Sequence, residues 1–237
     1  MAHPIIDRPH TVSSYDTELG KVGSIITEMA DLANTSLAGA MAALQHGDAV
    51  AALAIVEQDA AIDELERALE RLALMMIMSR APMAGDLRYL ISAIRIGKML
   101  ERTGDQAKRI ARRIDTLGSL GTAPAFALVS SMQRYACEMI SDAVTSFHDA
   151  SLERAQAVIR ADKELNAMNR MLVQSCCDAM DNRAVAAREG IEVIALGKQL
   201  ERVGDYGECL KLCVSERSHA VFRYSQASKR PANIMAS

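Results

Sequence analysis

The sequence predicts an all-α fold made of two tandem, pseudo-symmetric three-helix bundles. Three observations support this class. Apolar residues make up 50% of the chain and aromatic residues only 3%, a composition that favours helices over β-sheets. Long segments show the helical spacing of apolar residues, without a strand signal. The chain also contains nearly the same six residues twice, LERTGD at 100–105 and LERVGD at 200–205.

Six long helices are expected, in two sets of three. Gly47 and Asp48 separate the first two helices as C-cap and N-cap, and Pro82 marks the next turn. Asp86 is the expected N-cap of the third helix. The expected bounds of the first set are 14–46, 48–79 and 86–117. Those of the second set are 124–148, 152–180 and 185–224, with the sequence DNRA before the last helix.

The segment GSLGTAP at 118–124 is the clearest expected linker, and it divides the chain into two halves. The division matches a repeat, because 94–105 and 194–205 are identical at eight of twelve aligned positions. We therefore expect a flexible N-terminus, a first bundle, a linker, a second bundle and a flexible tail. Their expected ranges are 1–13, 14–118, 119–123, 124–224 and 225–237.

The repeated segment places acids and a glycine where a helix ordinarily avoids them. A Glu and an Asp lie four residues apart, a like-charge pair that destabilises a helix by about 0.2–0.5 kcal/mol. The glycine before the Asp costs about 1 kcal/mol relative to Ala. Because the acids continue an apolar face, we expect them to point into the bundle, with the glycines admitting a close neighbour. The residues are Glu101, Gly104, Asp105, Glu201, Gly204 and Asp205.

The predicted turns indicate which residues lie beside each acidic pair. In an antiparallel hairpin, residues equally far from the turn lie at one height. Positions 59 and 101 have their midpoint at 80, positions 63 and 101 at 82, and positions 162 and 201 between 181 and 182. All of these fall in predicted turns. Two sites are therefore expected: Asp59, Asp63, Glu101 and Asp105 in the first half, and Asp162, Asn166, Glu201 and Asp205 in the second.

Oxygen ligand sets of this kind suit hard or intermediate cations. A divalent or trivalent metal ion is the expected occupant, with Mg, Mn, Fe and Zn all open, and the second site is one acid short. The alternative is a polar layer neutralised by Arg or Lys, since Arg102 and Arg202 directly follow the glutamates. Adjacent helix positions point about 100° apart, so these arginines are expected to reach elsewhere.

Other chemistries find less support in the sequence. A ferritin-like di-iron enzyme needs Glu-x-x-His on two helices, and the one match, Glu216 with His219, lies far from both sites. There is no Walker-type phosphate loop and no arguable Ser–His–Asp set. We therefore expect a protein that is not an enzyme, and we keep a metal-dependent helical-bundle enzyme or a metal-storage protein as alternatives.

Charge and hydropathy bound the partners and the compartment. The net charge of −3 argues against nucleic acid as the main partner. No apolar run is long enough to span a bilayer, and the N-terminus lacks the apolar core of a signal peptide, so a cytoplasmic protein is expected. The five cysteines are expected to be buried apolar residues, although Cys209 and Cys213, four apart, could share a metal.

Three segments resemble a known family. They are VEQDAAIDELE from Val56, RAPMAGDLRYLISAIRIGKMLERTGDQAKRIA over 80–111, and GKQLERVGDYGECL from Gly197. Together with the doubled E-R-x-G-D segment, they are similar to the PhoU family of bacterial phosphate-transport accessory regulators. The first half matches over nearly its whole length, including an AP-x-x-x-DLR turn, and the second half matches best in its last helix. The supporting residues then expected are Arg102, Arg202, Gly104, Gly204, Asp86 and Arg88.

The resemblance implies a cytoplasmic, often dimeric regulator that restrains phosphate uptake and the phosphate-starvation two-component response. The implied partners are the ATPase subunit of the phosphate ABC transporter and the phosphate sensor histidine kinase, so contact with the membrane would be only through those complexes. Paired acidic motifs of the family hold multinuclear metal clusters, and they map onto the two sites above. This chain departs from many relatives at Arg109 and Cys209, where those have Asn, and at Asn166, which makes metal in the second site less expected.

Overall fold

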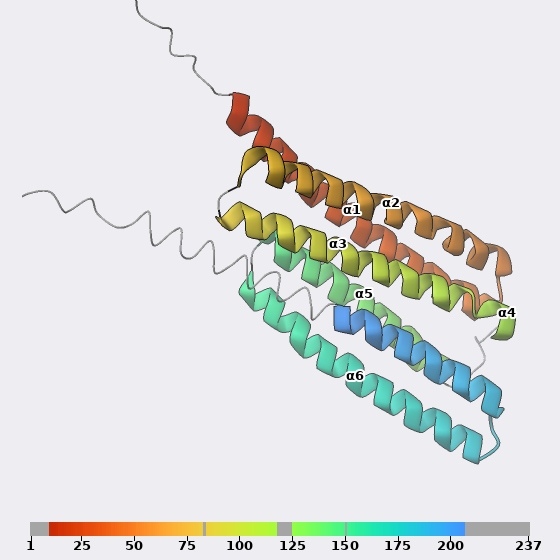
Figure 1. Cartoon of the computed structure of the whole chain (residues 1–237). Helices are drawn as coiled ribbons and strands as arrows, with labels where there is room; N and C mark the ends of the chain where they lie inside the picture. Colours follow the sequence, from red (N-terminus) through yellow and green to blue (C-terminus); the bar gives the residue numbers. More distant parts are fainter. Residues whose placement is uncertain (1–9, 83, 118–124, 150, 207–237) are drawn as a thin grey trace, which may run out of the picture.

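The computed structural model describes residues 10–82, 84–117, 125–149 and 151–206, which form helices and no strand. The first half contains α1 (His10–His46), α2 (Ala49–Arg80), α3 (Ala84–Ala111) and the short α4 (Ile114–Leu117). The second half contains α5 (Phe126–Asp149), α6 (Leu152–Asp181) and a last helix described over 187–206. The predicted all-α class with two three-helix units is confirmed (Figure 1).

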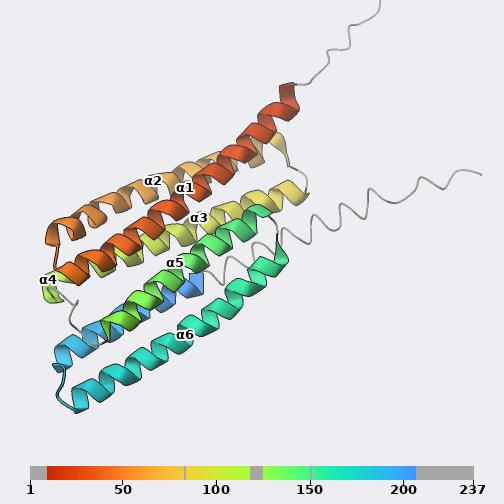
Figure 2. The ribbon, with the colours of Figure 1, turned by 180° about the vertical axis from the view of Figure 1, so that it is seen from behind.

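The two units lie side by side with their helices roughly aligned. Helix α2 forms one edge of the molecule and α6 the opposite edge, while α1 and α5 run next to each other between them (Figures 1 and 2). Between α1 and α5, Asn34 Nδ2 donates to Ser141 Oγ at 3.0 Å. Arg113, which follows α3, contacts the last helix: its Nε donates to Gln199 Oε1 at 3.1 Å, and its guanidinium also bonds Glu192. The junction also contains apolar contacts, because the ring of Tyr89 on α3 stacks on that of Phe147 on α5 with centroids 5.1 Å apart.

The buried apolar side chains of both units form one continuous core. Burial of one large side chain contributes about 1.5–3 kcal/mol, so these residues supply the main driving force for folding. In the first unit the fully buried side chains include Ile26, Met29, Leu37, Ile62, Leu69, Leu90, Ile96 and Leu100. In the second unit they include Met132, Phe147, Leu165, Leu172, Leu196 and Leu200. Among the described residues, no helix is long and apolar enough to cross a bilayer.

Several helix ends agree with the sequence, and two differ. Asp48 caps α2 as expected, because its Oδ1 accepts from the backbone N–H of Val50 at 3.1 Å and of Ala51 at 2.9 Å. Asp86 is not the N-cap of α3. That helix begins two residues earlier, so Asp86 lies in its first turn, where its charge favours the helix dipole.

The expected single helix over 86–117 is interrupted after Ala111. The N–H of Arg113 bonds the carbonyl of Ile110 at 3.0 Å, which tightens the chain into a turn before α4. The break is accompanied by the contact of Arg113 with the last helix. The remaining expected bounds shift by a few residues. Of the predicted flexible N-terminus 1–13, residues 10–13 are instead the first turn of α1, and 1–9 lie outside the described residues. The linker 119–123, the helix beyond 206 and the tail 225–237 also lie outside them, as do Cys209, Cys213, Glu216 and His219.

Glycines bring the helices of each hairpin close together. A Cβ at Gly97 of α3 would lie 2.6 Å from Leu69 Cδ2 on α2. A Cβ at Gly197, the repeat equivalent, would lie 2.4 Å from Leu172 Cδ2 on α6. Real Cβ atoms do not approach other atoms this closely, so a side chain at either glycine would force the facing leucine or its helix to move.

We predict that Gly97→Ala lowers the free energy of unfolding by about 1–3 kcal/mol, because the added methyl overpacks a buried contact with Leu69. Gly20→Ala on α1 is the matched control, since a methyl group at Gly20 would meet nothing within 4 Å. That change should raise stability by about 0.5–1 kcal/mol through helix propensity. Urea unfolding followed by circular dichroism measures both. Equal effects of the two changes would contradict the close-contact explanation.

Candidate functional site

The α2–α3 hairpin brings the predicted residues of the first site to one height. Asp59 on α2 is buried, and its Oδ1 lies 3.3 Å from the place where a Cβ of Gly104 would be. Glu101, one turn earlier on α3, has a side chain that is 18% exposed. Asp63 and Asp105 are more open, at 39% and 37%. The first site therefore has a buried floor at Asp59 and an open rim.

Lys108 neutralises the floor of the first site. Its ammonium group donates to Asp59 Oδ2 and lies 3.7 Å from Oδ1 of Asp105. The hydrogen bond to Asp59 raises the pKa of Lys108 above its ordinary value of 10.5, against the opposing effect of burial. Asp63 has a separate cation, since Arg67 lies 3.9 Å from it.

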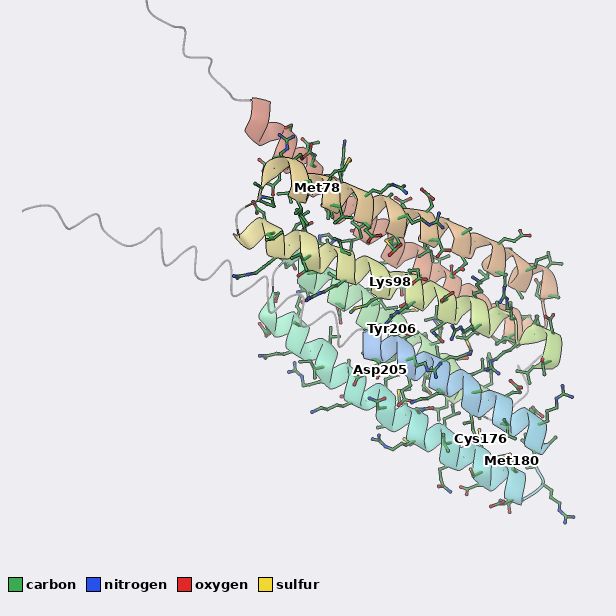
Figure 3. The ribbon with its side chains drawn as sticks, viewed as in Figure 1. Met78, Lys98, Cys176, Met180, Asp205 and Tyr206 are labelled. Carbon is green, nitrogen blue, oxygen red and sulfur yellow. The ribbon has the colours of Figure 1, made fainter. Side chains whose placement is uncertain are left out.

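Lys98 neutralises the other end of the first site and reveals an acid that sequence reasoning missed. Its Nζ lies 3.0 Å from Glu101 Oε2 and 4.0 Å from Glu66 Oε1 (Lys98 is labelled on α3 in Figure 3). The hydrogen bond to Glu101 raises the pKa of Lys98. Glu66 follows Asp63 by three residues, a spacing that keeps both on one helix face and could have identified it.

The second hairpin repeats the arrangement with amides in place of acids. Asp162 on α6 is buried, and its Oδ2 accepts a hydrogen bond from Asn166 Nδ2 at 3.0 Å. Glu201 Oε2 accepts from Asn169 Nδ2 at 2.7 Å and from Lys198 Nζ at 2.6 Å. The Glu201 side chain is 18% exposed, the same as its counterpart in the first half.

The glycine contacts fix how α2 corresponds to α6, with an offset of 103 residues. The corresponding pairs are Asp59 and Asp162, Ile62 and Leu165, Asp63 and Asn166, and Glu66 and Asn169. Two acids of the first site are thus amides in the second, one more than the sequence alone indicated. Asp205 completes the second set from the last helix, where it is exposed (Figure 3).

The charge balance of the two sites consequently differs. The first site has five acids and two lysines, Lys98 and Lys108. The second has three acids, which are Asp162, Glu201 and Asp205, and one described lysine, Lys198. The sequence position that corresponds to Lys108 is Glu208, which lies outside the described residues. The first site is therefore the stronger concentration of carboxylate oxygens among the described residues.

The expected supporting residues fall into two groups. Gly104 and Gly204 lie against the site acids, since a Cβ at Gly204 would be 3.1 Å from Asp162 Oδ1, as one at Gly104 would be 3.3 Å from Asp59 Oδ1. Arg102 and Arg202 are exposed, and the described cations that contact the two glutamates are lysines instead. This arrangement agrees with the expectation that the arginines point elsewhere.

Asp86 and Arg88 lie in the first turn of α3, well away from the first site. Asp86 is 15 residues before Glu101, or about 22 Å along the helix. Burial and then the charge of Asp86 raise the pKa of Tyr15 on α1 to about 12. These two residues therefore belong to the turn end of the hairpin.

Comparison with known proteins accounts for the duplicated geometry. The family model of the PhoU domain matches twice, over residues 26–114 and 129–209. The chain belongs to the PhoU family. A "phosphate-specific transport system accessory protein PhoU homolog" of Zymomonas mobilis subsp. mobilis is 32% identical over 197 residues, which are 83% of each chain. The homolog of Caulobacter vibrioides is 33% identical over 202 residues, 83% of this chain and 86% of its own.

Solved PhoU structures share the fold. The crystal structure of PhoU from Pseudomonas aeruginosa superposes with a TM-score of 0.80 at 26% identity, covering 87% of this chain and 99% of that one. A phosphate transport system regulatory protein PhoU from Streptococcus pneumoniae gives a TM-score of 0.79 at 21% identity, covering 87% and 97%. The latter likeness shows the fold alone. Both support the two-unit arrangement of helices.

The donor chemistry of the two PhoU repeats suits a hard cation, although the lysines now hold the carboxylates. Among the described residues, no three His, Cys, Asp or Glu side chains are grouped so that they could hold a metal ion. In the second site, the buried Oδ1 atoms of Asn166 and Asn169 accept no hydrogen bond from the described part of the chain. Asn166 and the carboxylates remain the predicted ligands, and Asn169 adds an acceptor oxygen that the sequence did not predict.

The lysine pairs of the first site predict a specific loss of stability in alkali. The pKa of Lys108 is raised on folding, so its contribution is complete below the unfolded pKa and disappears as pH rises through the folded pKa, above 10.5. Urea unfolding of the native protein between about pH 9 and 11.5 should therefore show a steeper loss than that of Asp59→Asn/Lys108→Met, which lacks the pair. If the free energy of unfolding of the two proteins falls equally with pH, the Asp59–Lys108 pair does not contribute to stability.

Proposed function

We propose that this chain is a phosphate-responsive regulatory adaptor. It restrains phosphate uptake and the phosphate-starvation two-component response. The observation that carries this proposal is the double match to the PhoU domain, together with relatives that cover 83% of the chain and are named phosphate-specific transport accessory proteins. The proposed partners are the ATPase subunit of the phosphate ABC transporter and the phosphate sensor histidine kinase. The chain acts from the cytoplasm as a homodimer and reaches the membrane only through those complexes.

In this proposal the carboxylate sites are binding elements and not catalytic ones. Asp59, Asp63, Glu101 and Asp105 would hold a divalent or trivalent metal ion in the first site, which would supply positive charge where the lysines now supply it. Lys98 can move away from Glu101 into solvent, because its side chain is 51% exposed. Lys108 is more enclosed at 26%, so its departure from Asp59 is the harder step.

The two sites should differ in affinity for a hard cation. The second site offers Asp162, Asn166, Glu201 and Asp205, and its amide oxygens bring no negative charge to balance a multivalent ion. The buried acceptor oxygens of Asn166 and Asn169 support weak binding of a single cation there rather than a cluster. We therefore propose that metal occupies the first site preferentially.

The regulatory role predicts the phenotype of a deletion strain. Loss of the gene should raise expression from a phosphate-starvation reporter when phosphate is plentiful, because the sensor kinase is no longer held off. A strain that carries the gene on a plasmid is the control and should restore low expression. An unchanged reporter in the deletion strain would rule out the regulatory proposal.

The metal proposal predicts a selective effect of two matched double changes. Added Mn²⁺ should raise the melting temperature of the full chain purified without chelator, since an ion that binds only the folded state stabilises it. Glu101→Gln/Asp105→Asn should abolish most of that rise, whereas Glu201→Gln/Asp205→Asn should leave most of it. Elemental analysis of the same samples reports occupancy. No bound metal together with unchanged melting of the native chain would contradict the proposal.

A further inference from the structure

Helix α2 carries an unusual amount of exposed apolar surface. Of the eight large hydrophobic side chains that are exposed in the described part of the chain, five lie on this helix. They are Val50, Leu53, Leu74, Met75 and Met78, and the first and last are about four-fifths exposed, at 81% and 80%. Exposed apolar side chains gathered at the two ends of one helix indicate an interaction surface.

Four of these side chains, all but Leu74, lie on one stripe along the outer side of α2. Residues 50, 53, 57, 64, 71, 75 and 78 follow one another at spacings of three, four or seven, which keeps them on one face. The opposite face packs into the bundle through Ile62, Leu69 and Met76. Helix α2 is also the edge of the molecule farthest from the second unit, so no other described helix covers the stripe (Figures 1 and 2).

The middle of the stripe is charged and has a direction. Glu57 lies toward the N-terminal end and Arg71 toward the C-terminal end. Glu64 lies between them, where it accepts hydrogen bonds from Arg67 at 2.8 Å and Arg71 at 2.9 Å. The arginines lower the pKa of Glu64, so this acid stays charged. From residue 50 to residue 78, the stripe is therefore apolar, acidic, basic and apolar in turn.

This order is self-complementary when two copies run antiparallel. If a two-fold axis passes at Glu64, residues whose numbers sum to 128 lie opposite each other. Val50 then faces Met78 of the second copy, Leu53 faces Met75, and Glu57 faces Arg71. Apolar ends then meet apolar ends, and Glu57 meets Arg71. Glu64 faces Glu64 of the second copy on the axis, where each is already held by its own Arg67 and Arg71. A parallel pair would instead place Glu57 beside Glu57 and Arg71 beside Arg71, which is unfavourable.

We propose that the outer face of α2 is a self-association surface, on which the α2 helices of two copies pack antiparallel about a two-fold axis near Glu64. The apolar ends supply burial, and the Glu57–Arg71 pairs fix the register. This inference rests on the part of the proposed function that calls for two copies of the chain, and it names the surface they use. The regulatory role and the metal sites do not depend on it.

Light scattering on the full chain after gel filtration tests the surface. The native protein should have the mass of two chains, and Met75→Glu should halve that mass by placing a charge in the apolar end. The matched control is Met171→Glu, on an exposed methionine of α6, which should leave the mass unchanged. Circular dichroism confirms that each variant is folded. A monomeric native protein, or a Met75→Glu protein that stays dimeric, overturns the proposal.

Charge reversal tests the antiparallel register. Arg71→Glu should weaken dimerisation, and Glu57→Arg/Arg71→Glu should recover it, because each new pair is again of opposite sign. Failure of the double variant to recover overturns the antiparallel arrangement. A monomeric native protein that binds anionic vesicles through Met75 and Met78 would assign the face to a membrane surface instead. If the reporter responds to gene deletion while the protein is monomeric, the regulatory role is supported and self-association through α2 is rejected.

Discussion

The close approach of two helices at glycine is the constraint on which the rest of the structure depends. Gly104 lets α3 come so near α2 that Asp59 is buried in the contact, and Gly204 does the same for Asp162. A buried carboxylate must be paired or hydrogen-bonded to remain charged. The glycines therefore determine where the acids lie, and the acids in turn require the cations and amides that surround them. The position of both sites follows from this packing contact.

Electrostatics then makes the two repeats unequal. Lys108 holds the buried Asp59 in the first unit, whereas Asn166 bonds the buried Asp162 in the second. Lysine can be replaced by another cation, because exchange of one positive charge for another leaves the carboxylates balanced. An amide offers no such exchange. Duplication thus preserved the fold of the unit while its charge diverged, which favours one binding site and one mainly structural layer.

The sequence predicted the helical hairpins well because turn residues and apolar spacing are local signals. Midpoint arithmetic placed residue 59 at the height of the repeated acids, and burial of Asp59 against Gly104 agrees with it. Glu66 and its equivalent Asn169 were not predicted, because they lie one turn further along the helix than the acidic pairs that the hairpin geometry aligned. Neutralisation of the acids by Arg or Lys was the alternative that the sequence left open, but Lys98 and Lys108 were not identified, because they depend on side-chain reach. The turn at Arg113 was not predicted, since it is accompanied by a contact between the two units.

We propose that a metal ion and the two lysines compete for the same carboxylates of the first site. A crystal structure grown with Mn²⁺, with its anomalous signal, measures this directly. We expect manganese bound by Asp59, Asp63, Glu101 and Asp105, with Lys98 and Lys108 displaced and weaker density or none at the second site. Intact lysine pairs with no anomalous peak at the first site, from crystals that contain Mn²⁺ in solution, would contradict this competition.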